Sequence, residues 1–304
     1  MKVLLVGDIV GRPGRNAFTQ IVGQMRDAGE VDFVIANGEN SAAGRGPTPE
    51  MTQAILASGA DVIILGDHTW DSKEMVAGID LEERVIRPAN FPKEAPGRGW
   101  VRVETPEGPL VVMQLIGRVF MQPHQACPFT TADRMLKGEL ANDRAIFVDI
   151  HAEATSEKMA IGRYLDGRVT SVTGTHTHCQ TSDARLFPKG TAFMTDLGMT
   201  GPQDSVLGRE VEPVVAKFIT GLPHRFDVAS GNPALEGALL DVDMTTGRAR
   251  STWARSTQTT RWEPCRRGAA GSLRAPPLGA AATTPARRLR VLRQDSAVNG
   301  DLPE

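Results

Sequence analysis

The stretch Val3-Leu4-Leu5-Val6-Gly7-Asp8 decides the fold, because a continuous apolar run ends there in a glycine and a carboxylate. Such a run is typical of a strand buried on both faces of a parallel sheet. Residues 15–28 follow with helical spacing, and residues 33–36 form a second apolar run. Thr48-Pro49-Glu50 has the pattern of a capped helix start, and residues 62–65 form a third run. This β-α-β-α-β order predicts a parallel sheet with right-handed crossovers.

The middle of the chain is predicted to contain short strands joined by tight turns. Two hairpin signals occur, at Pro106-Glu107-Gly108 and at Thr245-Thr246-Gly247. We expect strands at 100–104, 110–115, 145–150, 169–173, 185–188, 191–195, 238–243 and 248–252, and helices at 130–140 and 212–220. Mixed sheets with helices outside them indicate a layered α/β sandwich rather than a simple dinucleotide-binding domain.

The overall composition is that of a soluble globular protein, with 40% hydrophobic and 23% charged residues among 304. No apolar run approaches the roughly 20 residues that span a bilayer, so no membrane partner is expected. The three cysteines form no close pair and no metal-type spacing, which favours a reducing compartment. We therefore expect a cytoplasmic protein.

The charge is divided unevenly along the chain. Residues 251–304 contain nine Arg, no Lys and four acids, a net +5, which leaves 25 basic and 32 acidic residues in 1–250, a net −7. We predict a folded domain over 1–250 and a basic, disordered tail over 251–304. A shifted reading frame and a nucleic-acid-binding arm are the alternatives for the tail. The acidic body favours small substrates over a stable nucleic-acid complex.

Polar clusters follow five of the predicted strands, where ligands gather in open α/β sheets. They are Gly7-Asp8-Ile9-Val10-Gly11, Asn37-Gly38-Glu39-Asn40, Gly66-Asp67-His68-Thr69-Trp70-Asp71, Asp149-Ile150-His151-Ala152-Glu153 and Gly174-Thr175-His176-Thr177-His178. Each cluster alone is ordinary turn or cap chemistry, but five together indicate one functional site. The spacing of Gly7, Gly11 and Gly14 is not that of a nucleotide-binding loop, and Pro13, where the helix would begin, further disfavours that alternative.

The histidines point to a metal centre, because imidazole is the commonest transition-metal ligand. His151, His176 and His178 follow strand-like runs, and the last two can face the same cleft if the backbone there is irregular. His124 and His224 are expected on the surface. Glu153 and Glu157 are expected to cap or solvate a helix start.

In their order along the chain, the five clusters resemble the motifs of the calcineurin-like metallophosphoesterases. The residues of these motifs are similar to those of the YmdB-type phosphodiesterases. The similar segments are Gly7–Gly14, Asn37–Asn40, His68–Asp71, His151–Lys158 and Gly174–His178. The resemblance covers roughly residues 1–250 and implies a catalytic domain there. It also implies a four-layer α/β/β/α sandwich of two mixed sheets flanked by helices.

The resemblance implies two metal ions and assigns a role to each cluster. His68 would lie outside the metal shell as the general acid. One metal would be held by Asp8, Glu39, Asn40 and His178, and Glu39 would bridge to a second metal completed by Asp67, His151 and His176. Family members hydrolyse phosphodiesters, including 2',3'-cyclic nucleotides, with iron or manganese.

The chemistry of these residue types agrees with those roles. Two cations ~3.5–4 Å apart clamp the attacking and leaving oxygens of an in-line displacement, and a hydroxide that bridges them attacks. Imidazole and oxygen ligands favour Fe or Mn, with Zn or Co as further candidates. His68 would protonate the leaving alkoxide.

One residue departs from the family pattern, because Asp67 stands where the family usually has Asn. The extra carboxylate should bind cations more tightly and weaken them as Lewis acids. Two other functions remain open at this stage: a phosphomonoesterase with the same site, and a metal- or nucleotide-binding regulatory protein with little turnover. A homo-oligomer is a candidate assembly.

Overall fold

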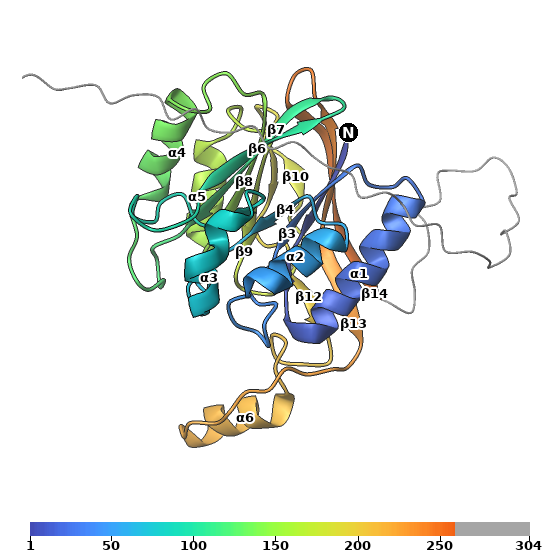
Figure 1. The fold of residues 1–304 in the computed structure, drawn as a ribbon, viewed down its shortest axis with the longest axis vertical. Helices are drawn as coiled ribbons and strands as arrows, with labels where there is room; N and C mark the ends of the chain where they lie inside the picture. The colour runs from blue at the N-terminus through green and yellow to red at the C-terminus, as the bar shows by residue number, and fades with distance from the viewer. Residues whose placement is uncertain (259–304) are drawn as a thin grey trace, which may run out of the picture.

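The protein, a computed structural model that describes residues 1–258, consists of two mixed β-sheets packed face to face with helices outside each (Figure 1). The first sheet has the order β2-β12-β13-β1-β3-β4-β5, with β14 beside β13. Its strands are β1 (Lys2–Val6), β2 (Asp8–Ile9), β3 (Phe33–Asn37), β4 (Val62–Ile64), β5 (Val85–Ile86), β12 (Met199–Pro202), β13 (Pro233–Asp243) and β14 (Arg248–Gln258).

The second sheet has the order β10-β11-β9-β8-β7-β6, in which β7, β8, β9 and β11 run parallel. Its strands are β6 (Trp100–Thr105), β7 (Gly108–Ile116), β8 (Ala145–His151), β9 (Ser171–Thr175), β10 (Arg185–Leu186) and β11 (Ala192–Met194). The helices are α1 (Gly11–Asp27), α2 (Pro49–Ala57), α3 (Lys73–Gly78), the 3₁₀ turn η1 (Ile79–Leu81), α4 (Pro128–Lys137), α5 (Thr155–Tyr164) and α6 (Val211–Thr220).

Three apolar cores separate these four layers. In β1, Leu4 faces a core shared with α1 and α2, whereas Leu5 faces a core between the two sheets. The third core lies between the second sheet and helices α4 and α5. Because successive side chains of a strand point to opposite faces, the apolar residues Val3–Val6 of β1 contribute to two cores. The predicted four-layer sandwich is confirmed.

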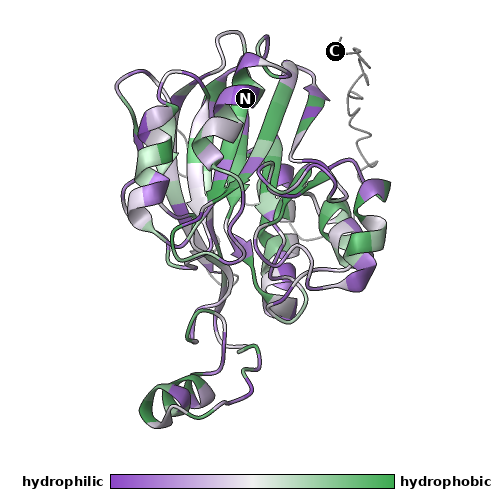
Figure 2. Cartoon of the chain, turned by 90° about the vertical axis from the view of Figure 1, so that its left-hand side faces the viewer, coloured by the Kyte–Doolittle hydropathy of each residue, from purple (hydrophilic) through white to green (hydrophobic). Residues whose placement is uncertain are grey.

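Helix α6 differs from the others because it projects from the body (Figure 2). Its Phe218 and Ile219 side chains are 84% and 78% exposed. Among residues 1–258, no helix is both long and apolar enough to cross a membrane.

Both predicted hairpins form, since β6 pairs with β7 and β13 pairs with β14 in antiparallel fashion. The predicted boundary after residue 250 falls inside β14, which continues to Gln258. The first half of β14 was predicted at 248–252, but the polar sequence after it concealed the continuation, because an edge strand need bury little apolar area. Strand β12 was also missed, and α1 begins at Gly11 rather than at residue 15. The rest of the predicted tail, 259–304, lies outside the described residues.

Candidate metal centre

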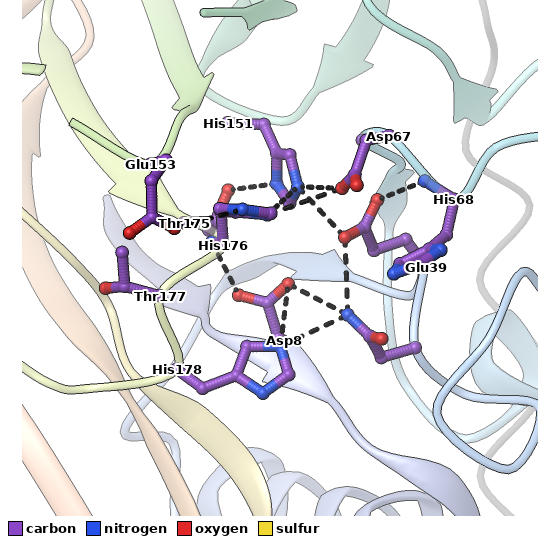
Figure 3. A network of polar contacts seen from close by, with 12 residues as sticks. Asp8, Glu39, Asp67, His68, His151, Glu153, Thr175, His176, Thr177 and His178 are labelled. Atoms are coloured by element: carbon purple, nitrogen blue, oxygen red, sulfur yellow. Dashed lines mark hydrogen bonds and ion pairs between the residues drawn. The ribbon is translucent and has the colours of Figure 1, made fainter. Parts of the chain in front are cut away.

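The structure brings all five strand-end clusters together at one end of the sandwich (Figure 3). The carboxyl ends of the two sheets meet there, since the backbone N–H of His176, after β9, donates to Asp8, after β1, at 3.1 Å. Each predicted site residue contacts at least one other member of the set: Asp8, Glu39, Asn40, Asp67, His68, His151, His176 and His178.

Four of these residues form a compact set, the first donor group (Glu39, Asp67, His151 and His176). One potential ligand atom from each lies within 4.8 Å of all the others. His151 Nε2 is 2.9 Å from Glu39 Oε1 and 2.8 Å from Asp67 Oδ1. His176 Nδ1 is 3.0 Å from the same His151 nitrogen. Four donors that converge on one small volume are the arrangement that a metal ion requires.

Three further residues form the second donor group (Asp8, Asn40 and His178). Asn40 Nδ2 is 3.4 Å from Asp8 Oδ1 and 3.2 Å from His178 Nε2. His178 Nε2 is 3.8 Å from Asp8 Oδ1. The same Asn40 nitrogen is 3.3 Å from Glu39 Oε1, so the Glu39 carboxylate faces both groups.

The loop after β9 has the irregular backbone under which both imidazoles could face the same cleft. His176 and His178 have φ values of 99° and 60°, in the left-handed region that bulky residues rarely adopt. Asp196 stabilises this loop by accepting from Thr177 N at 3.2 Å and from Thr177 Oγ1 at 2.7 Å. Both imidazoles thereby face the donor groups.

Asp196 is itself held by a buried ion pair that the sequence analysis missed. Lys158 Nζ, on α5, is 2.6 Å from Asp196 Oδ2, and both side chains are almost fully buried. Asp196 comes directly after the predicted strand 191–195, the same position that the predicted site acids occupy. This position after a strand was the sequence signal by which Asp196 could have been recognised as part of the site.

Behind His151, a chain of buried hydrogen bonds fixes the imidazole. His151 Nδ1 is 2.9 Å from Thr175 Oγ1, which donates to Asp149 Oδ2 at 2.7 Å. Gln114 also donates to Asp149, at 2.9 Å. Because the Thr175 hydroxyl gives its proton to Asp149, it accepts from His151 Nδ1, which leaves Nε2 directed at the donor group. Burial raises the pKa of Asp149 to about 7, although the hydrogen bonds from Thr175 and Gln114 lower it.

His68 lies beside the first donor group in a different setting. Its backbone N–H donates to Glu39 Oε2 at 3.2 Å, and its Nδ1 is 2.9 Å from Asp71 Oδ2. Burial lowers the pKa of His68, but the carboxylates of Glu39, Asp67 and Asp71 outweigh it and leave the pKa above its ordinary value. The surrounding carboxylates therefore favour the protonated form of this imidazole.

The charges of the site fit a cation. Asp8 and Glu39 are fully buried carboxylates. Burial lowers the pKa of His151, yet Glu39 and Asp67 reverse this and hold the pKa well above its ordinary value. Buried carboxylates that draw a proton onto an imidazole have an excess of negative charge, which a metal ion would neutralise. Imidazole and carboxylate donors suit transition metals.

The structure shows the surroundings of the four residues that were expected to lie outside the site. His124 and His224 are exposed, as expected. Glu157 is buried in the first turn of α5, but its carboxylate accepts from the backbone N–H groups of Arg118 and Val119. It therefore anchors a neighbouring loop, and the expectation that it caps or solvates the helix start was wrong. Glu153 Oε2 lies 3.3 Å from His176 Nε2.

Comparison with known proteins agrees with this geometry. The YmdB-like protein family model matches residues 4–253. The chain is 45% identical to a 2',3'-cyclic-nucleotide 2'-phosphodiesterase of Bacillus subtilis over 82% of this chain and 94% of the relative. It is 32% identical to a putative phosphatase/phosphodiesterase of Mycoplasma pneumoniae over 84% of this chain and 92% of the relative.

Solved structures give the same result. A hypothetical protein from Thermus thermophilus superposes with a TM-score of 0.79 at 41% identity, covering 85% of this chain and 99% of the other. A novel phosphatase from Mycoplasma pneumoniae has a TM-score of 0.79 at 31% identity, covering 85% and 93%. The chain therefore belongs to the YmdB-like family and is a phosphoesterase.

Proposed function

We propose that the protein is a dinuclear metal-dependent phosphodiesterase that hydrolyses small phosphodiesters such as 2',3'-cyclic nucleotides. The observation that carries this proposal is the position of Glu39, whose Oε1 contacts His151 of the first donor group and Asn40 of the second. A carboxylate shared between two ligand sets is the natural bridge of a two-metal site. The Bacillus subtilis relative, 45% identical, bears the name of a 2',3'-cyclic-nucleotide phosphodiesterase.

The donor groups define which residues would hold each metal. The first would use Glu39, Asp67, His151 and His176, and the second Asp8, Asn40 and His178 together with Glu39. When bound, two transition metals would supply the positive charge that clamps the attacking and leaving oxygens. The mixture of imidazole and oxygen donors favours Fe or Mn, with Zn or Co as further candidates.

His68 is proposed as the general acid. Its Nδ1 donates to Asp71, which leaves Nε2 for the leaving group, and its raised pKa favours the protonated form that a general acid requires. In the reaction, a hydroxide would attack phosphorus in line with the leaving group. As the new P–O bond forms, the bond between phosphorus and the leaving ribose oxygen breaks, and His68 gives its proton to that oxygen. Such proton transfer contributes typically 10²–10⁴-fold to the rate.

The test is hydrolysis of 2',3'-cyclic AMP by the protein loaded with Mn²⁺, followed by chromatography of the nucleotide monophosphate. His68→Ala should lower kcat by about 10²–10⁴-fold while elemental analysis still finds the metals of the wild type. p-Nitrophenyl phosphate tests the phosphomonoesterase alternative. Absence of diester turnover in a metal-loaded wild type would overturn the proposal.

A further inference from the structure

The loop of residues 117–126, between β7 and α4, lies next to the candidate metal centre. Ile116, the residue before it, is paired in register with His151, and Gly117 N donates to His151 O at 2.9 Å. Further along the loop, Met121 is buried in a small apolar cluster against which Trp70 packs, and Trp70 is two residues from His68. The 117–126 loop therefore extends from the His151 side of the centre to the His68 side.

Buried polar side chains hold both ends of this loop. Asn90, 2% exposed, accepts from Ile116 N at 2.9 Å and donates to the carbonyl oxygens of Ile116 and Ala126, both at 2.8 Å. The buried Glu157 carboxylate accepts from Arg118 N at 3.0 Å and from Val119 N at 3.1 Å. Because these bonds would be costly to leave unmade, the loop is fixed where it leaves the sheet.

Phe120 is held out into solvent by this fixed loop. Its side chain is 85% exposed, and its φ of 62° is in the left-handed region that bulky residues rarely adopt. Val119, before it, is bound by Glu157, and Met121, after it, is buried in the cluster against which Trp70 packs, so the backbone of Phe120 is anchored on both sides. An exposed phenyl ring contributes none of the free energy that its burial would give. Residues with a strained backbone conformation, such as a positive φ, cluster at ligand sites.

We propose that Phe120 is the platform on which the nucleobase of the substrate stacks while its phosphodiester occupies the metal centre. The inference rests on the proposed phosphodiesterase function and adds the group that binds the base. An aromatic face stacks on any base, so this platform would increase affinity for nucleosides without selecting one base over another.

The experiment compares two substrates that differ only in the base: 2',3'-cyclic AMP and ribose 2',3'-cyclic phosphate. For each enzyme variant, kcat/KM is measured on both, and the ratio of the two values reports the contribution of the base. Phe120→Ala should lower this ratio by about 5- to 150-fold, mainly through KM. Phe120→Leu, which keeps apolar bulk without a π-face, should also lower it, whereas Phe120→Trp should retain it.

Phe218→Ala is the matched control, because Phe218 is 84% exposed but lies on the projecting helix α6. It should leave the ratio unchanged. A Phe120→Ala enzyme with the wild-type ratio, or a Phe120→Leu enzyme with the full ratio, would overturn the stacking proposal. Failure of the wild type on both substrates would instead overturn the proposed function, so the two failures are distinguishable.

Discussion

The two donor groups use the same kinds of ligand but are supported differently. Contacts within the first group run from 2.8 to 3.3 Å, whereas those within the second run from 3.2 to 3.8 Å. His151 of the first group is fully buried and backed by Thr175 and Asp149. His178 of the second is 3.3 Å from the carbonyl oxygen of Leu207, which is 49% exposed. Because buried support fixes a ligand, we expect the first group to bind its metal more tightly.

The largest effect should come from breaking both groups at once. Glu39→Gln removes the charge and one ligating oxygen from the carboxylate whose Oε1 contacts a side chain of each group, His151 and Asn40. We expect at most one bound ion by elemental analysis and a loss of turnover of at least about a thousandfold. The control is Glu236→Gln, a half-buried carboxylate that accepts from Met199 N. Two bound ions in Glu39→Gln would contradict the bridging role.

A smaller effect should separate the two groups. Thr175→Val keeps the shape of the side chain but removes the hydroxyl between His151 and Asp149. Loss of such outer support typically lowers metal affinity by 10- to 100-fold, so Mn²⁺ titration calorimetry should show weaker binding at one site and an unchanged second site.

The matched control for this variant is Thr170→Val. Thr170 is also fully buried, and its hydroxyl bonds Ile146 N and Gly247 O, away from the donor groups. It should destabilise the protein to a similar extent without changing metal affinity. If both threonine variants weaken binding equally, the difference between the donor groups is not due to the Thr175 hydroxyl.

The pH profile should respond to Asp71. Its carboxylate helps to raise the pKa of His68, and a general acid acts only while it is protonated. Turnover should therefore fall as pH rises through the pKa of His68, and Asp71→Asn should move this alkaline limb to lower pH. Glu74→Gln removes a carboxylate from the same turn that accepts from Ser72 Oγ, and it should leave the limb in place. An unshifted limb in Asp71→Asn would exclude this role.

The smallest effect is expected at Asp67, where the family usually has Asn. Asp67→Asn leaves an oxygen beside His151 and His176, so both metals and activity should be retained. Elemental analysis together with kcat checks this. Loss of the metal held by the first donor group would show that the charge of Asp67, and not only its oxygen, is required.

Much of the site could be predicted because parallel strands impose their own geometry. Any polar residue directly after β1, β3, β4, β8 or β9 must reach the same end of the sandwich, whatever the lengths of the intervening helices. The Lys158–Asp196 pair could not be predicted, because it depends on how α5 packs over the end of β11. Asp149 was included in the predicted cluster of His151, but its supporting role could not be predicted, because its partners Thr175 and Gln114 come from neighbouring strands. The metal and catalytic roles of the assembled residues remain predictions.

Gly66 carries a consequence for how this chain can change over time. A side-chain carbon at Gly66 would overlap the Glu39 carboxylate and the His151 ring, so the wall of the centre is bare backbone. Every substitution of this glycine adds at least that carbon, so even the smallest change, to alanine, would produce the overlap. Mutational drift can proceed through exposed positions such as Phe218, whereas a side chain at position 66 would displace two proposed metal ligands, although the glycine supplies no ligand itself.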